Sequence, residues 1–258
     1  RCLDISKPET VTFVKNLLAE YMTGDDPVFV SKIVHIGTDE YPREYASQMV
    51  TYTDTLIKYV NSLGYTPRFW GGLGPNGFGG PNNSGNAQVN FWDLNISGVS
   101  ETLACDYDII NTVNNTLYVV PTTNYNFPDY FDLEKLYTKW QVNYFNVDGT
   151  YKMDADDDRL LGACFALWND LHTTYHGVTR FDIFDRVRGM ACLVAEKTWL
   201  GEKTKNISAS DFVSRYNKLS LRAGDADPGR PSVPAEGLSV DFDIEYISCL
   251  YIFYQRIF

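Results

Sequence analysis

Strand-like and helix-like segments alternate along most of this sequence, and this alternation limits the possible fold more than any other feature. Helical spacing of apolar residues follows a predicted capping box at Ser6 and Glu9, and it recurs at 44–63. A further helix is predicted at 179–199, with Thr179 as its N-cap and Asp182 near the N3 position. Short apolar runs typical of strands lie at 28–36, 68–70, 88–92, 109–112 with 117–120, and 161–168. Strands that alternate with helices predict a parallel α/β sheet.

Polar and aromatic residues end each of these strand candidates. They are Asp39 and Glu40, Trp70, Trp92, Tyr118, and Trp168 with Asp170. Functional residues at several strand ends favour a TIM (β/α)8-type barrel over an open sheet, where ligand groups gather at one switch point. A closed barrel needs about 250 residues, and these strand-helix units occupy about 200. We therefore expect only about the last five units of a barrel.

Composition changes near residue 222. The segment 224–237 is rich in Pro, Gly, Ala and Asp, which is typical of a linker, and 238–246 alternates like a strand. We predict that residues 1–222 form the C-terminal part of a barrel, and that 223–258 form a linker and the start of a following β-rich segment.

The net charge of −11 argues against nucleic acid and anionic membranes as partners, because both require clustered Lys and Arg. No apolar stretch is long enough to cross a membrane, and no signal peptide is recognised. The 18 Tyr and five Trp instead suit neutral sugars, whose C–H faces pack on aromatic rings. Most of these aromatics are nevertheless expected to build the core.

We predict no metal site and no cofactor. The acidic run 154–158 lacks the spacing and glycine of an EF-hand loop, and the five cysteines show no metal-ligand spacing. His172 and His176 are four residues apart, but no Glu accompanies them in the zinc-protease pattern.

The segment His35-Ile36-Gly37-Thr38-Asp39-Glu40-Tyr41 carries two adjacent carboxylates after a strand-like run. Within a strand their side chains would point in opposite directions, whereas beyond its end both can reach one cleft. An ordinary solvated turn is the simpler interpretation of an Asp-Glu pair. His35 alone is likewise more typical of a hydrogen-bonded core histidine than of a catalytic group.

This segment resembles the His-x-Gly-x-Asp-Glu motif of glycoside hydrolase family 20, the β-N-acetylhexosaminidases and lacto-N-biosidases. The resemblance continues in order through Trp70, Trp92, Tyr118 and Trp168-Asn169-Asp170, and covers roughly residues 3–202. It implies the second half of that family's catalytic barrel, without its N-terminal half.

The resemblance implies retaining, substrate-assisted hydrolysis, in which the 2-acetamido oxygen of the sugar is the nucleophile. Glu40 then protonates the leaving oxygen and later activates water. Asp39 orients the acetamido N–H, and Tyr118 bonds the acetamido oxygen. The implied partners are oligosaccharide or glycoconjugate glycans that bear N-acetylhexosamine, and the implied location is extracellular or at the cell surface.

The resemblance also implies a set of substrate-binding residues. Trp70, Trp92 and Trp168 would enclose the acetamido methyl and the sugar ring, Asp170 would bind hydroxyls, and we place His35 with them. Without the order of the motifs, core filling would be the better interpretation of each tryptophan.

Two positions depart from the pattern of the commoner exo-hexosaminidases. Those enzymes carry an aspartate two residues after the tyrosine, where this chain has Val120, and many have glutamate at the position of Asp170. A lacto-N-biosidase, which releases a disaccharide, needs a roomier pocket there, and the Gly-rich segment 71–85 is suited to shape one. The alternative from another class is a non-catalytic carbohydrate-binding fragment, because half a barrel has open strand edges.

Overall fold

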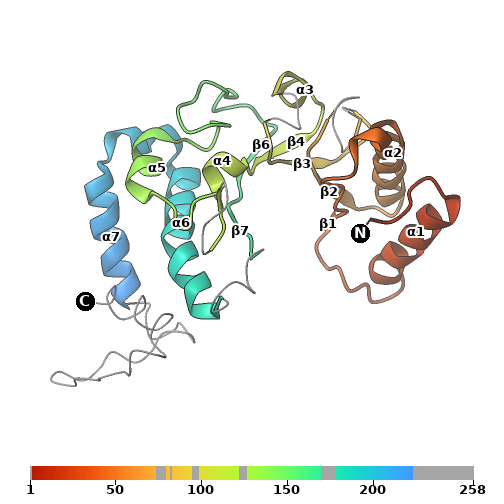
Figure 1. Ribbon diagram of the computed structural model, residues 1–258, viewed down its shortest axis with the longest axis horizontal. Coiled ribbons are helices and arrows are strands. Elements are labelled where there is room, and N and C mark those ends of the chain that lie inside the picture. The colour runs from red at the N-terminus through yellow and green to blue at the C-terminus, as the bar shows by residue number, and fades with distance from the viewer. Residues whose placement is uncertain are drawn as a thin grey trace.

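Parallel strands form the centre of the protein (Figure 1). The computed structural model describes residues 2–73, 80–81, 83–94, 99–121, 127–169 and 178–222. One parallel sheet has the order β1 (Ile33–His35), β2 (Thr66–Trp70), β3 (Gln88–Phe91), β4 (Asp108–Asn111) and β6 (Leu160–Ala163). A second parallel pair joins β5 (Tyr118–Val119) to β7 (Ala166–Leu167). The predicted parallel α/β class is confirmed.

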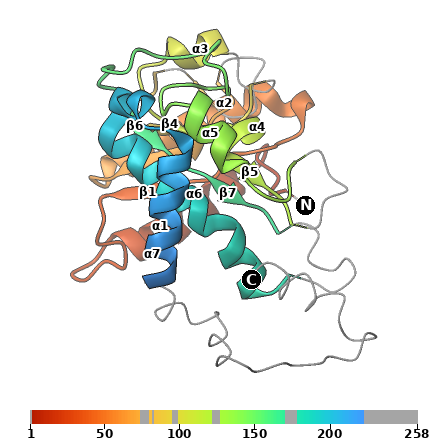
Figure 2. The same cartoon turned by 90° about the vertical axis from the view of Figure 1, so that its left-hand side faces the viewer.

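Helices cover this sheet at both ends of the molecule. The helices are α1 (Pro8–Met22), α2 (Ala46–Ser62), α3 (Val99–Leu103), α4 (Asn114–Leu117), α5 (Leu133–Lys139), α6 (Arg180–Leu200) and α7 (Ala209–Arg222), with 3-10 turns η1 (Arg43–Tyr45) and η2 (Gly201–Asn206). In Figure 1, α1 and α2 lie beside β1 and β2, and α2 packs on β2. The other end holds α5, α6 and α7, which contact one another and lie together in Figure 2.

The two predicted helix starts have different outcomes. At α6 a capping box forms, because the Thr179 hydroxyl accepts from the Asp182 amide and the Asp182 carboxylate accepts from the Thr179 amide at 2.8 Å. The capping box expected at α1 is wrong. Lys7 is the N-cap there, and the Ser6 hydroxyl donates to the Asp4 carboxylate at 2.6 Å. Pro8 opens the helix, which suits a position that needs no backbone N–H.

Three predicted strands differ from the observed ones. The run 28–36 is a strand only at Ile33–His35, and the side chains of Val28 and Val30 are 65% and 88% exposed. Ile33 pairs with Thr66, the first residue of β2, so the residues before Ile33 have no strand residue of β2 beside them. The run 117–120 begins in α4, and 161–168 divides into β6 and β7. These are local irregularities that apolar patterning does not encode.

Separate apolar clusters hold the sheet and the helices. Beneath the sheet, Phe69 and Tyr107 are fully buried and meet edge to face at 5.4 Å. At the other end, Phe212 of α7 stacks on Tyr137 of α5 at 4.5 Å and packs with Trp140 and Leu193. The strands β2, β3 and β4 therefore rest on a different core from the three C-terminal helices, whose core also includes Ala163 of β6.

The sheet is an arc of parallel strands that covers part of a TIM barrel, with β1 as one edge of the strand order. None of the helices described here is both long and apolar enough to cross a membrane. The predicted linker and β-rich segment at 223–258 lie outside the described residues.

Candidate active site

The loop after β1 carries the acidic pair. It first continues alongside β2, because the Ile36 amide donates to the Arg68 carbonyl at 2.8 Å and the Trp70 amide donates to the Gly37 carbonyl at 2.9 Å. Strand-like pairing thus extends to Gly37. Asp39 and Glu40 follow in the irregular segment before η1, and both side chains are exposed. The backbone between Gly37 and Glu40 decides where they point.

That backbone is left-handed at three of four residues. The φ angles are +78° at Gly37, +80° at Thr38 and +48° at Glu40. A left-handed conformation costs about 1–2 kcal/mol per residue outside glycine, and it is most unusual for a β-branched residue. A Cβ on Gly37 would meet nothing within 4 Å, so φ rather than space favours glycine. The loop breaks the strand alternation that would separate the two carboxylates.

Neighbouring strand ends supply aromatic rings. Trp70 is the last residue of β2, Trp92 follows β3, Tyr118 opens β5 and Trp168 follows β7. The Trp168 ring lies between the rings of Trp70 and Tyr118. Its centroid is 6.1 Å from that of Trp70 and 5.5 Å from that of Tyr118. Directly after Trp70, Gly71 permits a close approach to β3, because a Cβ there would lie 2.9 Å from the Val89 side chain. The rings form one continuous aromatic wall.

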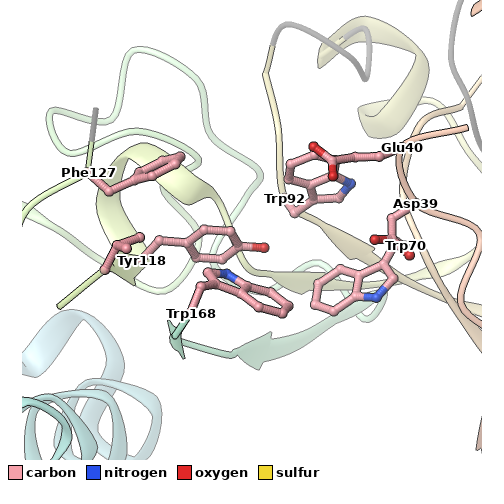
Figure 3. Close-up of a pocket in the computed structure, with 8 residues that line it drawn as sticks. Asp39, Glu40, Trp70, Trp92, Tyr118, Phe127 and Trp168 are labelled. Atoms are coloured by element: carbon pink, nitrogen blue, oxygen red, sulfur yellow. The ribbon is translucent and has the colours of Figure 1, made fainter. Parts of the chain in front are cut away.

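A cavity of about 280 Å³ lies between the acidic pair and this wall (Figure 3). Its volume is at the small end of the range for small-molecule sites, roughly 300–1,000 Å³. Its lining residues are Asp39, Glu40, Trp70, Trp92, Tyr118, Val120, Phe127 and Trp168. The structure therefore brings together six of the residues singled out from the sequence, and their roles stay predictions.

Tyr118 is the hydrogen-bonding group of the aromatic wall. Its side chain is 5% exposed, and in Figure 3 its hydroxyl points toward the space between the tryptophans. Burial raises the pKa of Tyr118 well above its usual value, although a hydrogen bond with the Trp168 side chain acts in the opposite direction. The phenol therefore stays protonated at neutral pH and remains a donor.

Trp92 brings a second buried donor to the cavity. The residue is 8% exposed, and its indole nitrogen has no hydrogen-bond acceptor among the described residues. In Figure 3 this nitrogen lies on the side of the ring where Asp39 and Glu40 are drawn. A buried donor without an acceptor is costly, by about 1–3 kcal/mol, and such groups concentrate at functional sites.

His35 lies against Trp70, with ring centroids 5.2 Å apart, and is not among the residues that line the cavity. Its Nδ1 accepts the Gly37 amide at 3.1 Å. Desolvation, followed by the nearby charge of Arg68, lowers the pKa of His35. The imidazole is therefore neutral at pH 7 and supports the start of the acidic loop.

Three further residues bear on the site, namely Asp170, Val120 and Phe127. Asp170 lies outside the described residues, so its predicted contact with sugar hydroxyls stays a prediction. Val120, noted from the sequence only as a departure, is fully buried in the cavity wall. Phe127 was missed, because it follows no strand candidate and nothing in its local pattern marks it. Its ring lies 6.0 Å from that of Tyr118.

Comparisons with known proteins bear on the fold and on the family relationship. No family model matches the chain. The chain is 26% identical over 260 residues to a curated lacto-N-biosidase from Bifidobacterium bifidum. The aligned region covers 88% of this chain and 21% of that protein. This chain therefore spans about a fifth of the length of its curated relative.

Solved structures share the fold. A β-N-acetylhexosaminidase from Bacteroides fragilis superposes with a TM-score of 0.63 at 21% identity, over 93% of this chain and 49% of that one. A family 20 exo-β-N-acetylglucosaminidase from Vibrio harveyi gives 0.62 at 17% identity, over 92% and 38%. The chain spans half or less of these two structures. Its ordered site residues, its barrel-type sheet and its curated relative together relate it to glycoside hydrolase family 20.

Proposed function

We propose that the protein to which this chain contributes hydrolyses terminal β-linked N-acetylhexosamine-containing glycans with retention, by substrate-assisted catalysis. The observation that carries the proposal is the single cavity that holds Asp39, Glu40 and Tyr118 beside three tryptophans. The related proteins are glycoside hydrolases by name, including a lacto-N-biosidase and β-N-acetylhexosaminidases.

The adjacency of the carboxylates favours a nucleophile supplied by the substrate. Conventional retaining glycosidases hold acid and nucleophile on opposite sides of the scissile bond, about 5–5.5 Å apart. Consecutive residues on one loop are poorly placed to do so. Glu40 as acid and base, with Asp39 steadying the acetamido N–H, requires both groups beside the same sugar, and both residues line the cavity.

The aromatic wall suits an acetamido group. Its carbonyl oxygen needs a neutral donor, and the raised pKa of Tyr118 keeps that hydroxyl protonated. Its methyl group needs an apolar surface, which the rings of Trp70 and Trp168 provide. A pocket that excludes water and fixes the acetamido oxygen near the anomeric carbon raises the rate through proximity.

Val120 and Phe127 favour release of a disaccharide over release of a single sugar. Both are apolar and line the cavity, and Val120 stands where commoner exo-hexosaminidases carry an aspartate for outer hydroxyls. An apolar wall offers no acceptor to a free hydroxyl, but it can pack against the face of a second sugar. The finer proposal is therefore a lacto-N-biosidase-like specificity.

The first test replaces the proposed acid. Glu40→Gln in the longest natural protein that contains this chain should lower kcat on a chromogenic 2-acetamido-2-deoxy-β-glycoside by about 10²–10⁴-fold. Its melting temperature should be unchanged, because the side chain is exposed. Glu44→Gln is the matched control, since Glu44 is exposed in η1 and does not line the cavity. Normal turnover by Glu40→Gln would refute the enzyme assignment.

Three further measurements examine the finer claims. A substrate with a 2-hydroxyl in place of the 2-acetamido group should not turn over if the acetamido oxygen is the nucleophile, and NMR of the first-formed anomer should show retention. Chromogenic GlcNAc and chromogenic lacto-N-biose, offered side by side, separate the two specificities. Preference for the monosaccharide would remove the lacto-N-biosidase proposal.

The second candidate function is a non-catalytic sugar-binding fragment, which the single-neighbour edge strand β1 favours. The 258-residue chain alone should then quench or enhance tryptophan fluorescence on addition of N-acetylhexosamine without hydrolysing the chromogenic substrate. Hydrolysis by the chain alone would contradict this alternative and would mean that half a barrel suffices.

A further inference from the structure

We propose that Thr38 is a positioning residue that holds Asp39 and Glu40 on the same side of the cavity without touching the substrate. The inference rests on the proposed function for its kinetic readout. Its structural basis is independent of that function, because it concerns how the loop after β1 is fixed to the end of β2.

The first observation is the location of the strained backbone. Thr38 and Glu40 are the two residues other than glycine with positive φ in the described part of the chain, and they flank Asp39. Strain of this kind persists only where the surroundings enforce it, and it clusters at functional sites. Here the strain has a direct geometric result, because it removes the alternation that would send the two carboxylates to opposite faces.

The second observation is how the loop is fastened. The Gly37 carbonyl accepts the Trp70 amide at 2.9 Å, and the Thr38 hydroxyl donates to the Trp70 carbonyl at 3.5 Å. The two residues before Asp39 therefore hold both backbone groups of Trp70. The Trp70 ring lines the cavity, so this clamp links the acidic pair to the aromatic wall.

The third observation separates Thr38 from the residues that contact a ligand. Thr38 is half-buried and is not among the residues that line the cavity. A glycine would adopt the same φ without strain but would lack the hydroxyl. Threonine at this position therefore supplies the hydrogen bond to Trp70, although its backbone is strained at this φ angle.

Three variants isolate the hydroxyl from the strain. Thr38→Ser keeps the hydroxyl and removes the methyl. Thr38→Val keeps the branched shape and removes the hydroxyl. Thr38→Gly releases the strain and removes the clamp. Thr12→Val is the matched control, because the Thr12 hydroxyl makes a comparable bond to the Pro8 carbonyl at 3.1 Å, in α1 and outside the cavity lining.

Kinetics on the chromogenic substrate provide the first readout. We expect Thr38→Ser and Thr12→Val to keep kcat within about twofold. Thr38→Val should lose about tenfold in kcat with KM nearly unchanged, because the aromatic rings that bind the sugar are intact and only the acidic pair is misplaced. Thr38→Gly should melt at or above the wild-type temperature and still lose kcat. Equal kcat for the serine and valine variants, or full kcat for Thr38→Gly, would overturn the proposal.

Hydrogen exchange at the Trp70 amide, measured on the 258-residue chain, provides a readout that needs no activity. Thr38→Val should exchange faster than Thr38→Ser at this amide, while amides in α6 stay unchanged. If the wild-type protein fails to hydrolyse 2-acetamido glycosides, the proposed function fails and the exchange series still decides the clamp. Identical exchange in the two variants would overturn the clamp whatever the activity.

Discussion

The strand ends around the cavity and the C-terminal helices differ in how closely they follow local conformational preferences. Around the cavity, the acidic loop has left-handed residues at Thr38 and Glu40, and the indole nitrogen of Trp92 has no acceptor within the described part of the chain. In the helices, α6 begins with a complete capping box and Phe212 stacks on Tyr137 with only 12° between the ring planes. The backbone follows local conformational preferences at the start of α6 and departs from them in the acidic loop beside the cavity.

This difference indicates a division between stability and chemistry. Real proteins satisfy local rules wherever nothing else is required and depart from them at functional sites. Substitutions in the helices should therefore lower the free energy of unfolding, whereas substitutions at the cavity should change turnover and leave stability almost intact. Three substitutions test this division, from the largest expected effect to the smallest.

The strongest challenge to the comparison is Phe212→Ala. Phe212 is 2% exposed and packs between α5 and α6 on the helical core. The substitution should lower the free energy of unfolding by about 3–5 kcal/mol, because it removes apolar burial and leaves a cavity. Denaturant melts measure the loss, and sugar binding by the protein that remains folded should be unchanged. A loss below about 1 kcal/mol would show that the helices do not act as the stabilising region.

Tyr118→Phe is the corresponding test at the cavity. It removes one hydroxyl and keeps the buried ring, so the free energy of unfolding should change by less than about 1 kcal/mol. If the hydroxyl bonds the developing charge on the acetamido group, kcat should fall by about 10²–10³-fold. Steady-state kinetics and thermal melts on the same preparation compare the two effects. A large loss of stability with full kcat would show that Tyr118 serves stability and not turnover.

Replacement of Lys197 has the smallest expected effect of the three. It sharpens the comparison, because Lys197 is a buried cation, which lowers stability, within the otherwise stable C-terminal helices. Its side chain is fully buried in α6 and its ammonium donates to the Tyr137 carbonyl at 2.6 Å. Burial lowers the pKa of Lys197 to about 8. Between that value and the unfolded value of about 10.4, the unfolded chain binds the proton and the folded chain does not, so stability rises with pH.

Lys197→Met should remove this rise. The difference in free energy of unfolding, wild type minus variant, should increase by up to about 3 kcal/mol between pH 8 and 10.4. Buried cysteines with raised pKa values act with the opposite sign in part of this range, but both proteins carry them, so they cancel in the difference. Denaturant melts across this range provide the measurement. A flat difference would mean that Lys197 is protonated in the folded protein throughout.

Several features of the fold and site were readable from the sequence because they depend on neighbours along the chain. The helix at 179–199 was placed within one residue at each end, and Thr179 was identified as its N-cap with Asp182 near N3. The strand ends at Trp70 and Trp92 were also placed well, since short apolar runs precede them. The order of the motifs along the chain then predicted which residues share a cavity.

Other features depended on contacts that local patterning does not contain. The run 28–36 is rich in apolar residues, yet only Ile33–His35 pairs with β2 as a strand. Phe127 reaches the cavity from a loop, and His35 turns to Trp70 instead of lining the cavity. In each case the outcome depends on residues distant in sequence that the fold brings close.

By itself, the sequence determined the class of fold, the residues that end its strands and the presence of two adjacent carboxylates, because these follow from apolar periodicity and from the order of residues. Only the tertiary structure decided that both carboxylates face one cavity. That outcome requires a left-handed backbone at Thr38 and Glu40, and such a backbone persists because hydrogen bonds to Trp70, more than thirty residues away, hold it in place.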